Sequence, residues 1–521
     1  MVTKELKKNR GITLLALVIT IIILLILAGI TINAITGDNG IIQNAGQAKE
    51  ETEIANEREI VEKATVQAMG NNKYGNIEED ELQGELDKET GEGKTEATDI
   101  GEVFEIAFID SKRYYTVDKD GNVGEAQDII EDKSPGDITK DENGNSLKGD
   151  ESEPYEIWCI EDLVVFSMMT NGGNRELGLD ARNFDSEYVI LARTLNFNSV
   201  LSYNDYTTNK YGDINKDGNI ENIKTELTKT DDNCVGFEPI NNFQGNFDGK
   251  QNEIQNIYIN RDGNAALMIT SSVQILAESI KNLGITGKIT SKNDFAAGII
   301  SGYTAGSKSA NIIENCWNKA DVKTVSGITA AGICTGSYMV IKNCYNEGNI
   351  VNEANTSGQV GGIVAGTGGD NIVNCYNTGD ITGVNGTWYV GGIASGHGNN
   401  KTTIKNSYNR GKITGGGTAG GILGTNGEII ENCYNMGDVL QGRSNGGIVG
   451  NASEEIYNCY NAGTINGNTG VGIDGITELT KTEIINNKSF VETLNNNRGT
   501  NMEWKSWIIG EDGYPTLDFN T

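Results

Sequence analysis

The sequence has little proline and almost no histidine: its 521 residues include 4 prolines and a single histidine, His397. One histidine excludes a two-histidine H-E-x-x-H zinc site. The scarcity of proline excludes a polyproline linker and collagen. Basic residues are also in deficit, with 41 Lys and Arg against 72 Asp and Glu and a formal net charge of −31. This balance excludes a nucleic-acid partner bound through net positive charge.

Long apolar runs are absent except for one, from Ile12 to Ile30, which continues weakly to Ile35. At ~1.5 Å per residue such a helix spans a ~30 Å hydrocarbon core. Residues 1–11 before it carry four basic side chains, which the positive-inside rule keeps cytoplasmic. We expect a retained transmembrane helix over 12–36 with the rest of the chain outside the cell, and a cleaved secretory signal as the alternative.

The segment KKNRGITLLALVITIIILLILAGITI resembles the start of a type IV prepilin or type II secretion pseudopilin of clostridia-like bacteria. The resemblance implies cleavage by a prepilin peptidase between Gly11 and Ile12, with N-methylation of Ile12. It also implies a single-pass protein of the bacterial cell membrane. The fifth mature residue of that family is usually Glu, which neutralises a neighbouring subunit's terminal amine, but here it is Ala16. This departure implies a minor, tip-located or simply membrane-tethered subunit, with other pilin subunits as open partners.

The next 120 residues are acidic and divide into three parts. Apolar residues at helical spacing predict a stalk helix over 41–69. Alternating residues from 101 to 124 predict a β-hairpin, which places a small pilin-like α/β region at 70–124. Residues 50–160 hold 32 acidic and 11 basic side chains, and we expect 125–154 to be a solvated acidic linker.

The rest of the chain, 155–521, contains a repeat of the form I-x-N-C-Y-N-x-G-x-I at intervals of 26 to 33 residues. A second element, Gly-Ile followed by an apolar residue, lies between the copies, as at Gly362-Ile363-Val364 and Gly421-Ile422-Leu423. Short β-branched segments between Gly and Asn corners predict stacked coils ~4.8 Å apart, because one coil cannot bury its own inner face. We expect an all-β right-handed parallel β-helix, a β-solenoid, as the head of the protein.

Two residue types recur at fixed repeat positions. The cysteines stack with parallel Cβ vectors, so we expect a buried thiol ladder, with disulfides or a metal as alternatives. The tyrosines form an adjacent column, which is either structural or an exposed strip for glycan rings. The cysteine position holds Cys316, Cys344, Cys375, Ser407, Cys433 and Cys459, and the tyrosine position holds Tyr345, Tyr376, Tyr408, Tyr434 and Tyr460.

The array resembles the GLUG-motif repeats of bacterial surface proteins, which include IgA-cleaving metallopeptidases and many adhesins. The resemblance is carried by segments such as Gly362-Ile363-Val364-Ala365-Gly366 and Gly447-Ile448-Val449-Gly450, each followed by N-C-Y-N, and by the lead-in Phe243 to Gly249. It is specific for the fold and not for an activity.

The chain offers little for catalysis, and we expect no catalytic residues. Asp248, Asp321, Asp380 and Asp438 are the carboxylates that a β-helix polysaccharide lyase or hydrolase would use, but turn chemistry explains the last three. Residues 213–221 match a calcium loop, with ligand oxygens from Asp213, Asn215, Asp217, Asn219 and Glu221. Position 12 of that loop is Lys224 instead of a carboxylate, so Ca²⁺ is a possible cofactor and a plain polar loop is the alternative.

Together these features predict a non-enzymatic, membrane-anchored surface protein of the adhesin or minor-pilin kind. Its solenoid would bind a glycan or a cell-surface protein. The alternatives are a β-helix carbohydrate-active enzyme and a pseudopilin that serves secretion or pilus assembly.

Overall fold

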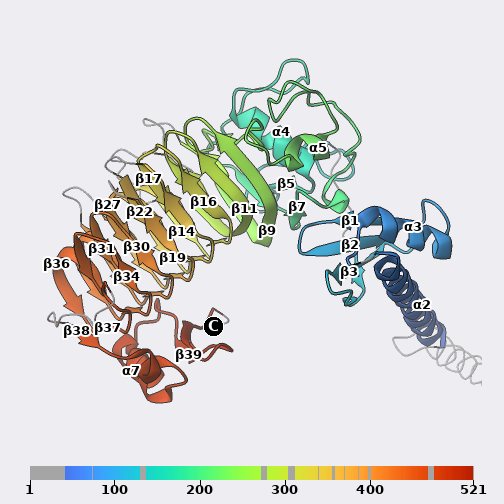
Figure 1. Cartoon of the computed structure of the whole chain (residues 1–521). Helices are drawn as coiled ribbons and strands as arrows, with labels where there is room; N and C mark the ends of the chain where they lie inside the picture. Colours follow the sequence, from blue (N-terminus) through green and yellow to red (C-terminus); the bar gives the residue numbers. More distant parts are fainter. Residues whose placement is uncertain are drawn as a thin grey trace, which may run out of the picture. The chain divides into compact units, whose positions relative to one another are not determined.

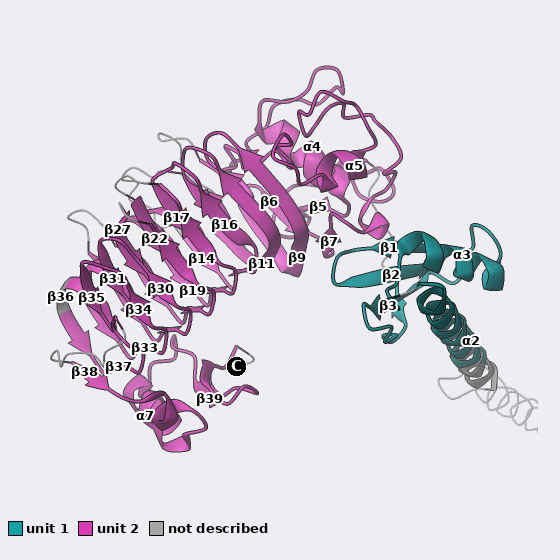
Figure 2. Ribbon diagram, viewed as in Figure 1, with its two compact units in different colours: residues 1–129 teal, residues 130–521 magenta. Residues whose placement is uncertain are grey.

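The computed structural model describes residues 41–72, 74–129, 136–270, 279–302, 311–337, 339–354, 358–368, 370–384, 387–396, 401–466 and 475–519. The chain divides into two compact units, residues 1–129 and 130–521 (Figure 2). The predicted leader 1–11, the predicted membrane helix 12–36 and His397 lie outside the described residues. Within the described ranges no helix has the length and apolarity needed to cross a membrane.

The first unit packs two helices with a four-stranded antiparallel sheet. Its elements are α2 (Ile41–Asn71), α3 (Glu79–Thr90), β1 (Thr95–Asp99), β2 (Val103–Phe108), β3 (Arg113–Asp118) and β4 (Gln127–Asp128), with strand order β1-β2-β3-β4. Helix α2 covers the predicted stalk, and β2 and β3 fall in the predicted hairpin region. Alternate residues of β2, such as Phe104 and Ile106, are buried with Val61 and Ala64 of α2. The alternation therefore builds the core of this unit.

A buried ion pair fixes α2 to the sheet. Arg113 Nε and Nη2 each donate to a carboxylate oxygen of Glu57 at 2.9 Å, and the Tyr115 hydroxyl donates to the same carboxylate at 3.1 Å. Burial would raise the pKa of Glu57, but the hydrogen bonds and charge of Arg113 outweigh it and hold that pKa below its ordinary value.

The described parts of the segment predicted as a linker, 125–129 and 136–154, belong to the two folded units. Strand β4 lies in the first unit, and Ile138 is buried in the hydrophobic core of the second. The Glu156 backbone N–H also donates to Ile138 O. The structure therefore differs from the prediction, because Ile138 and Leu147, two apolar residues among charges, pack against the core of the second unit.

The second unit is a β-solenoid of about 9 turns built from parallel strands (Figure 1). Corresponding strands of successive coils pair in five rows. The first row contains β5 (Tyr155–Ile157), β6 (Tyr188–Leu191), β9 (Asn246–Arg261), β11 (Ser279–Ser291), β14 (Asn311–Glu314), β19 (Met339–Lys342), β24 (Asn371–Val373), β28 (Thr402–Lys405), β32 (Leu423–Glu431) and β36 (Val449–Tyr457).

The long strands β9 and β11 also take part in the next two rows. The second row continues with β7 (Leu195–Asn196), β15 (Trp317–Asn318), β20 (Tyr345–Asn346), β25 (Tyr376–Asn377), β29 (Tyr408–Asn409), β33 (Tyr434–Asn435), β37 (Cys459–Asn461) and β38 (Ile476–Glu478). The third row continues with β16 (Asp321–Thr324), β21 (Ile350–Asn352), β26 (Ile381–Gly383), β30 (Ile413–Thr414) and β34 (Val439–Leu440).

Two further sheets complete the coils. One contains β12 (Ala296–Ala297), β17 (Thr329–Ala331), β22 (Gly358–Gly361), β27 (Thr387–Gly391), β31 (Thr418–Gly420) and β35 (Ser444–Gly446). The other contains β8 (Ile240–Asn241), β10 (Met268–Ile269), β13 (Ile300–Ser301), β18 (Cys334–Ser337) and β23 (Val364–Gly368).

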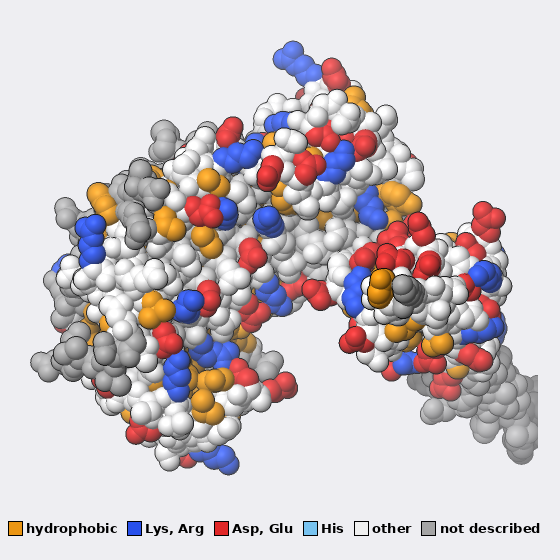
Figure 3. Space-filling view, viewed as in Figure 1, with side chains coloured by type: hydrophobic (Ala, Val, Ile, Leu, Met, Phe, Trp, Pro, Cys, Tyr) orange, Lys and Arg blue, Asp and Glu red, His pale blue; other side chains and the backbone are white. Residues whose placement is uncertain are grey.

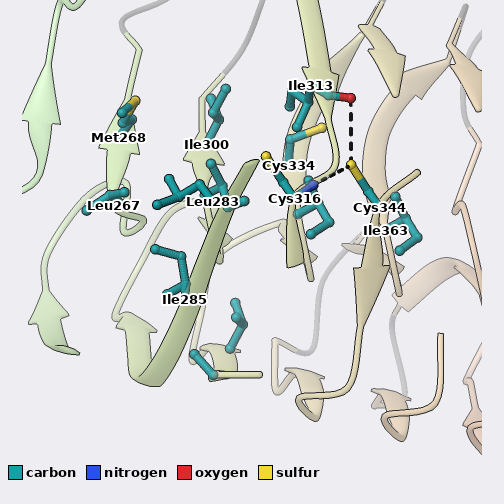
Figure 4. Packing of buried hydrophobic residues seen from close by; sticks show 14 of the residues in the cluster. Leu267, Met268, Leu283, Ile285, Ile300, Ile313, Cys316, Cys334, Cys344 and Ile363 are labelled. Carbon is teal, nitrogen blue, oxygen red and sulfur yellow. Dashed lines mark hydrogen bonds between the residues drawn. The ribbon is translucent and has the colours of Figure 1, made fainter. Parts of the chain in front are cut away.

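Like residues stack over like residues through the solenoid core. Ile280 pairs with Ile313, which pairs with Ile341. Figure 4 shows isoleucines and cysteines of successive coils directed into this interior. The glycine of the Gly-Ile element is needed because neighbouring coils approach closely there. A Cβ on Gly362 would lie 2.1 Å from Gly392 O.

Both ends of the solenoid carry non-repetitive structure. The N-terminal coils pack with α4 (Ile160–Thr170), the 3₁₀ turn η1 (Val200–Ser202) and α5 (Ile223–Thr228). After β38 the chain leaves the solenoid and forms α6 (Lys481–Ile484), α7 (Lys488–Arg498) and a hairpin of β39 (Trp507–Ile509) and β40 (Pro515–Leu517). We call residues 479–519 the C-terminal cap. The coils therefore end earlier than the predicted boundary at 521.

Candidate functional site

The N-C-Y-N motif forms a corner of each coil between the first and second rows. Its first asparagine has a left-handed backbone in every copy, with φ of 53° at Asn315 and 55° at Asn343, a conformation that asparagine tolerates better than most residues. Its side chain donates to the same residue of the preceding coil across 2.8 to 2.9 Å. This first asparagine ladder consists of Asn282, Asn315, Asn343, Asn374, Asn406 and Asn432.

The last asparagine of the motif forms a second ladder with the opposite direction. Each Nδ2 donates to the Oδ1 of the following coil at 2.7 to 2.9 Å and to the carbonyl two residues ahead. The second asparagine ladder consists of Asn318, Asn346, Asn377, Asn409, Asn435 and Asn461, all completely buried. These contacts use the amide groups fully, so the asparagines are structural.

The cysteine position is also a hydrogen-bonding position. Cys344 Sγ donates to Lys342 O at 3.1 Å. It also accepts from the Cys316 backbone N–H at 3.4 Å and lies 3.6 Å from Ile313 O, the two contacts that Figure 4 draws as dashed lines. Ser407 does the same, with its hydroxyl donating to Lys405 O at 2.8 Å and accepting from Cys375 N at 3.0 Å. All eight cysteines are free and buried, in agreement with a thiol ladder. Burial raises the pKa of Cys316, Cys344 and Cys433 well above the ordinary value, which suppresses thiolate chemistry.

From Tyr345 to Tyr434 the tyrosine column is a continuous stack of parallel rings. Centroids of Tyr345 and Tyr376 are 4.7 Å apart with 2° between the planes, and those of Tyr408 and Tyr434 are 5.0 Å apart with 1°. Each ring face inside the stack is therefore covered by its neighbour, and only edges and hydroxyls point outward. Because a sugar ring stacks on an aromatic face, this geometry favours the structural interpretation of the column over a strip that holds glycan rings.

The C-terminal cap covers part of this column. Tyr408 is 1% exposed and Tyr434 0%, and both rings contact Trp507. The Tyr408 hydroxyl lies 2.8 Å from Thr516 Oγ1, and the Tyr434 hydroxyl donates to Pro515 O. Tyr460 contacts Phe490 edge to face. Tyr408 and Tyr434 are thus excluded from ligand binding, contrary to the prediction for the exposed strip.

The other end of the column reaches the surface, and we call it the open end: Trp317, Tyr345 and Tyr376 with Phe519. Phe519 is 37% exposed and tilts 46° against Tyr345 at 6.3 Å. Trp317 stacks on Tyr345 at 6.0 Å and lies over Gly284, where a Cβ would come within 2.3 Å of the indole. Glycine at 284 is what lets the indole lie flat on the preceding coil.

Charged side chains surround the open end. Trp317 Nε1 donates to Glu253 Oε1 at 2.6 Å, and Lys319 Nζ lies 3.4 Å from the same oxygen. The Tyr376 hydroxyl donates to Glu347 Oε1 at 3.4 Å, and Glu347 and Lys319 are exposed. Burial would raise the pKa of Glu253, but hydrogen bonds from Gln255 and Trp317 outweigh it, so the pKa lies below its ordinary value. On the visible face of the second unit, acidic and basic side chains are interspersed (Figure 3).

The aspartates considered for catalysis are used in turns between coils. Asp380 Oδ1 accepts from Lys412 N at 3.0 Å, Asp438 Oδ1 from Thr464 N at 2.9 Å, and Asp321 Oδ1 from Asn349 N at 3.1 Å. Asp248 accepts from Asn282 Nδ2 at 2.9 Å. Each carboxylate thus binds a neighbouring coil or turn, and they do not converge as a catalytic pair.

The predicted calcium loop is folded, but it does not gather its carboxylates around a vacant centre. Lys229 Nζ lies 2.6 Å from Asp217 Oδ2 and 2.5 Å from Glu221 Oε2. Asp213, Asn215 and Asp217 accept backbone N–H groups of the loop itself, and Asn219 is exposed. Within the described ranges no group of three His, Cys, Asp or Glu side chains is arranged to hold a metal ion.

The fold is a parallel β-solenoid with a C-terminal cap. Its repeated N-C-Y-N motif is structural, and the open end of its tyrosine column is lined by aromatic and charged side chains. No protein-family model matches the chain, and no curated protein matches it. Among solved structures, the chain is similar to a "putative immunoglobulin A1 protease" from Bacteroides ovatus, with a TM-score of 0.43 and 19% identity over 75% of this chain and 99% of that one.

Proposed function

We propose that the chain is a non-enzymatic, cell-surface binding protein. Its solenoid presents the open end of the aromatic column to a glycan or to a protein on another cell. The observation that supports this most directly is the partial coverage of the column. The cap buries Tyr408 and Tyr434, whereas Tyr345 and Tyr376, which its residue Phe519 contacts, stay half-buried, as does Trp317.

The open end combines groups suited to a hydroxyl-rich ligand. Two tyrosyl hydroxyls one coil apart can donate or accept, and Glu253 and Glu347 accept. Phe519 provides an apolar surface outside the stack, on which a sugar ring or a side chain can pack. The proposal assigns no catalytic role to Asp321, Asp380 and Asp438, whose carboxylates accept backbone N–H groups in turns.

The sequence before the described residues supports a surface location. The basic residues 1–11 and the apolar run 12–36 match a prepilin-type anchor, with cleavage after Gly11 by a prepilin peptidase and N-methylation of Ile12. Helix α2 begins at Ile41, five residues after the end of this run. Ala16 in place of the family's Glu favours a tethered or minor subunit over a major filament subunit.

Binding by the full-length protein to immobilised polysaccharides and mucins tests this function. Tyr376→Phe removes one hydroxyl but keeps the ring stack, and we expect it to weaken binding by about fivefold to tenfold. Tyr457→Phe, at an exposed tyrosine of another surface, is the matched control. New reducing or unsaturated ends in the polysaccharide would instead support an enzyme, and unchanged binding by Tyr376→Phe would exclude the open end.

A further inference from the structure

Two carboxylates of the loop 213–221 contact a cationic group of the protein itself, the ammonium of Lys229. Lys229 lies eight residues beyond the loop and directs its ammonium group between Asp217 and Glu221, at 2.6 and 2.5 Å. These two carboxylates occupy positions 5 and 9 of the calcium-loop pattern, where their oxygens would face the metal. The Lys229 side chain is 24% exposed and the Asp217 side chain 10%, so the pair is well shielded from solvent.

The backbone of the loop already has the conformation that calcium loops use. Asp213, at position 1, accepts from the backbone N–H of Asp217 at 3.1 Å and of Gly218 at 3.0 Å. Gly218, at position 6, has φ of 92°, which permits the sharp turn. Asn215, at position 3, is completely buried with its Oδ1 on Asp217 N, and its Nδ2 has no hydrogen-bond partner.

The carboxylate that would complete a metal site serves another purpose. Glu226, which is 0% exposed, accepts from Glu221 N at 2.8 Å and from Asn215 N at 3.2 Å. Both of its oxygens therefore hold backbone amides on two sides of the loop. Lys224 stands at position 12, where a bidentate carboxylate is required.

We propose that this loop is a calcium-type loop in which the Lys229 ammonium permanently replaces the metal ion. One of the two positive charges that Ca²⁺ would supply is thus attached to the chain, and the loop needs no cation from solution. Its removal leaves Asp217 and Glu221 unneutralised beside Asp213 and Asn215, which are the hard oxygen ligands that Ca²⁺ prefers. The loop is therefore a latent Ca²⁺ site that Lys229 closes.

Thermal unfolding and calorimetry of the full-length protein in EDTA and in about 5 mM Ca²⁺, above the range of weak extracellular sites, test the proposal. We expect the wild type to show no Ca²⁺-dependent shift and no binding heat. Lys229→Met should unfold at lower temperature in EDTA and recover with Ca²⁺ at one ion per chain. Lys148→Met, which removes an exposed lysine paired with Glu153 outside the loop, is the control and should not respond.

Two results would overturn the proposal. One is a Ca²⁺-dependent stabilisation of the wild type, which would mean that the metal displaces Lys229. The other is a folded Lys229→Met protein that ignores Ca²⁺. If Lys229→Met does not fold in EDTA, purification in Ca²⁺ and the variant Lys229→Gln give the same comparison, and failure of both variants to fold with Ca²⁺ would also contradict a latent site.

Discussion

Asn461 donates from Nδ2 to Glu478 Oε2 across 2.7 Å, and this contact ends the second asparagine ladder. At the opposite end of the solenoid, Asn282 donates to Asp248 Oδ1 across 2.9 Å and ends the first ladder. The two chains of amides run in opposite directions, and each directs its last donor at a carboxylate. A carboxylate accepts more strongly than an amide, so it completes a polarised chain of hydrogen bonds in a buried setting.

Substitution inside a ladder should therefore destabilise the whole solenoid. Asn377 donates to Gly379 O and to Asn409 Oδ1, both at 2.8 Å, and is completely buried. Asn377→Asp replaces the two donors by a buried negative charge facing two acceptors, and we expect a loss of at least ~3 kcal/mol in unfolding free energy. Urea unfolding measures it. Asn233→Asp at an exposed turn is the control, and equal midpoints for the two variants would refute the ladder's role.

The cysteine position predicts a matched pair of substitutions at Ser407. Ser407→Cys should change the unfolding free energy by less than ~1 kcal/mol, because five other coils place a cysteine here and each directs its Sγ at the carbonyl two residues back, as Ser407 does. Ser407→Val leaves the buried Cys375 backbone N–H without a hydrogen-bond acceptor. We expect this variant to lose about 2 kcal/mol of unfolding free energy. If the two variants were equally stable, the position would serve only to fill space.

Asp370 predicts a pH dependence of stability. This side chain is 4% exposed, accepts from Met339 N at 3.0 Å, and burial raises its pKa to about 7. In the unfolded chain an aspartate titrates near ~3.9, so between about pH 4 and pH 7 the unfolded state loses its proton first and stability falls as pH rises. Above pH 7 this contribution is constant.

Asp370→Asn should remove that dependence. We expect the variant to match the wild type near pH 4 and to exceed it by up to ~4 kcal/mol near pH 7.5, since the two pKa values differ by ~3 pH units at ~1.4 kcal/mol each; urea unfolding across this range measures the difference. The difference between variant and wild type isolates Asp370 from the other carboxylates. A difference that does not vary with pH would contradict the assignment.

The Glu57–Arg113 pair predicts a local effect in the first unit. Arg113→Met leaves the Glu57 carboxylate buried without its cation, which should destabilise this unit by about 3 to 5 kcal/mol. Hydrogen exchange should show that β1 to β3 and the part of α2 near Glu57 lose protection. The protection of the solenoid should not change. Lys94→Met, at an exposed pair with Asp110, is the control and should leave the protection pattern unchanged.

The repeats allowed much of the fold to be predicted. Identical residues at a fixed period must stack when coils pair in parallel, so Cys344, Tyr345 and Asn346 could be assigned to a corner and the isoleucines to a core. The C-terminal cap could not be predicted in this way. Trp507 and Phe519 belong to no repeat, and only their aromatic character in a polar, non-periodic tail signals a docking segment.

The site was less predictable than the fold for the same reason. Tyr376 and Tyr434 are equivalent in sequence, and only the path of the cap makes one accessible and the other buried. Gly284 leaves room for the indole of Trp317, which stands in the next coil where other repeats have tyrosine. Both departures from the repeat are visible when the copies are aligned. Lys229 lies outside the loop whose carboxylates it neutralises, so the loop pattern alone favoured a metal.

The proposed surface display rests on processing at the N-terminus, and the intact mass of the N-terminal peptide from membrane-extracted protein tests it most directly. We predict a peptide that begins at N-methylated Ile12. A peptide that retains Met1 and the basic residues 2–11 would contradict prepilin-type processing and with it the proposed anchor.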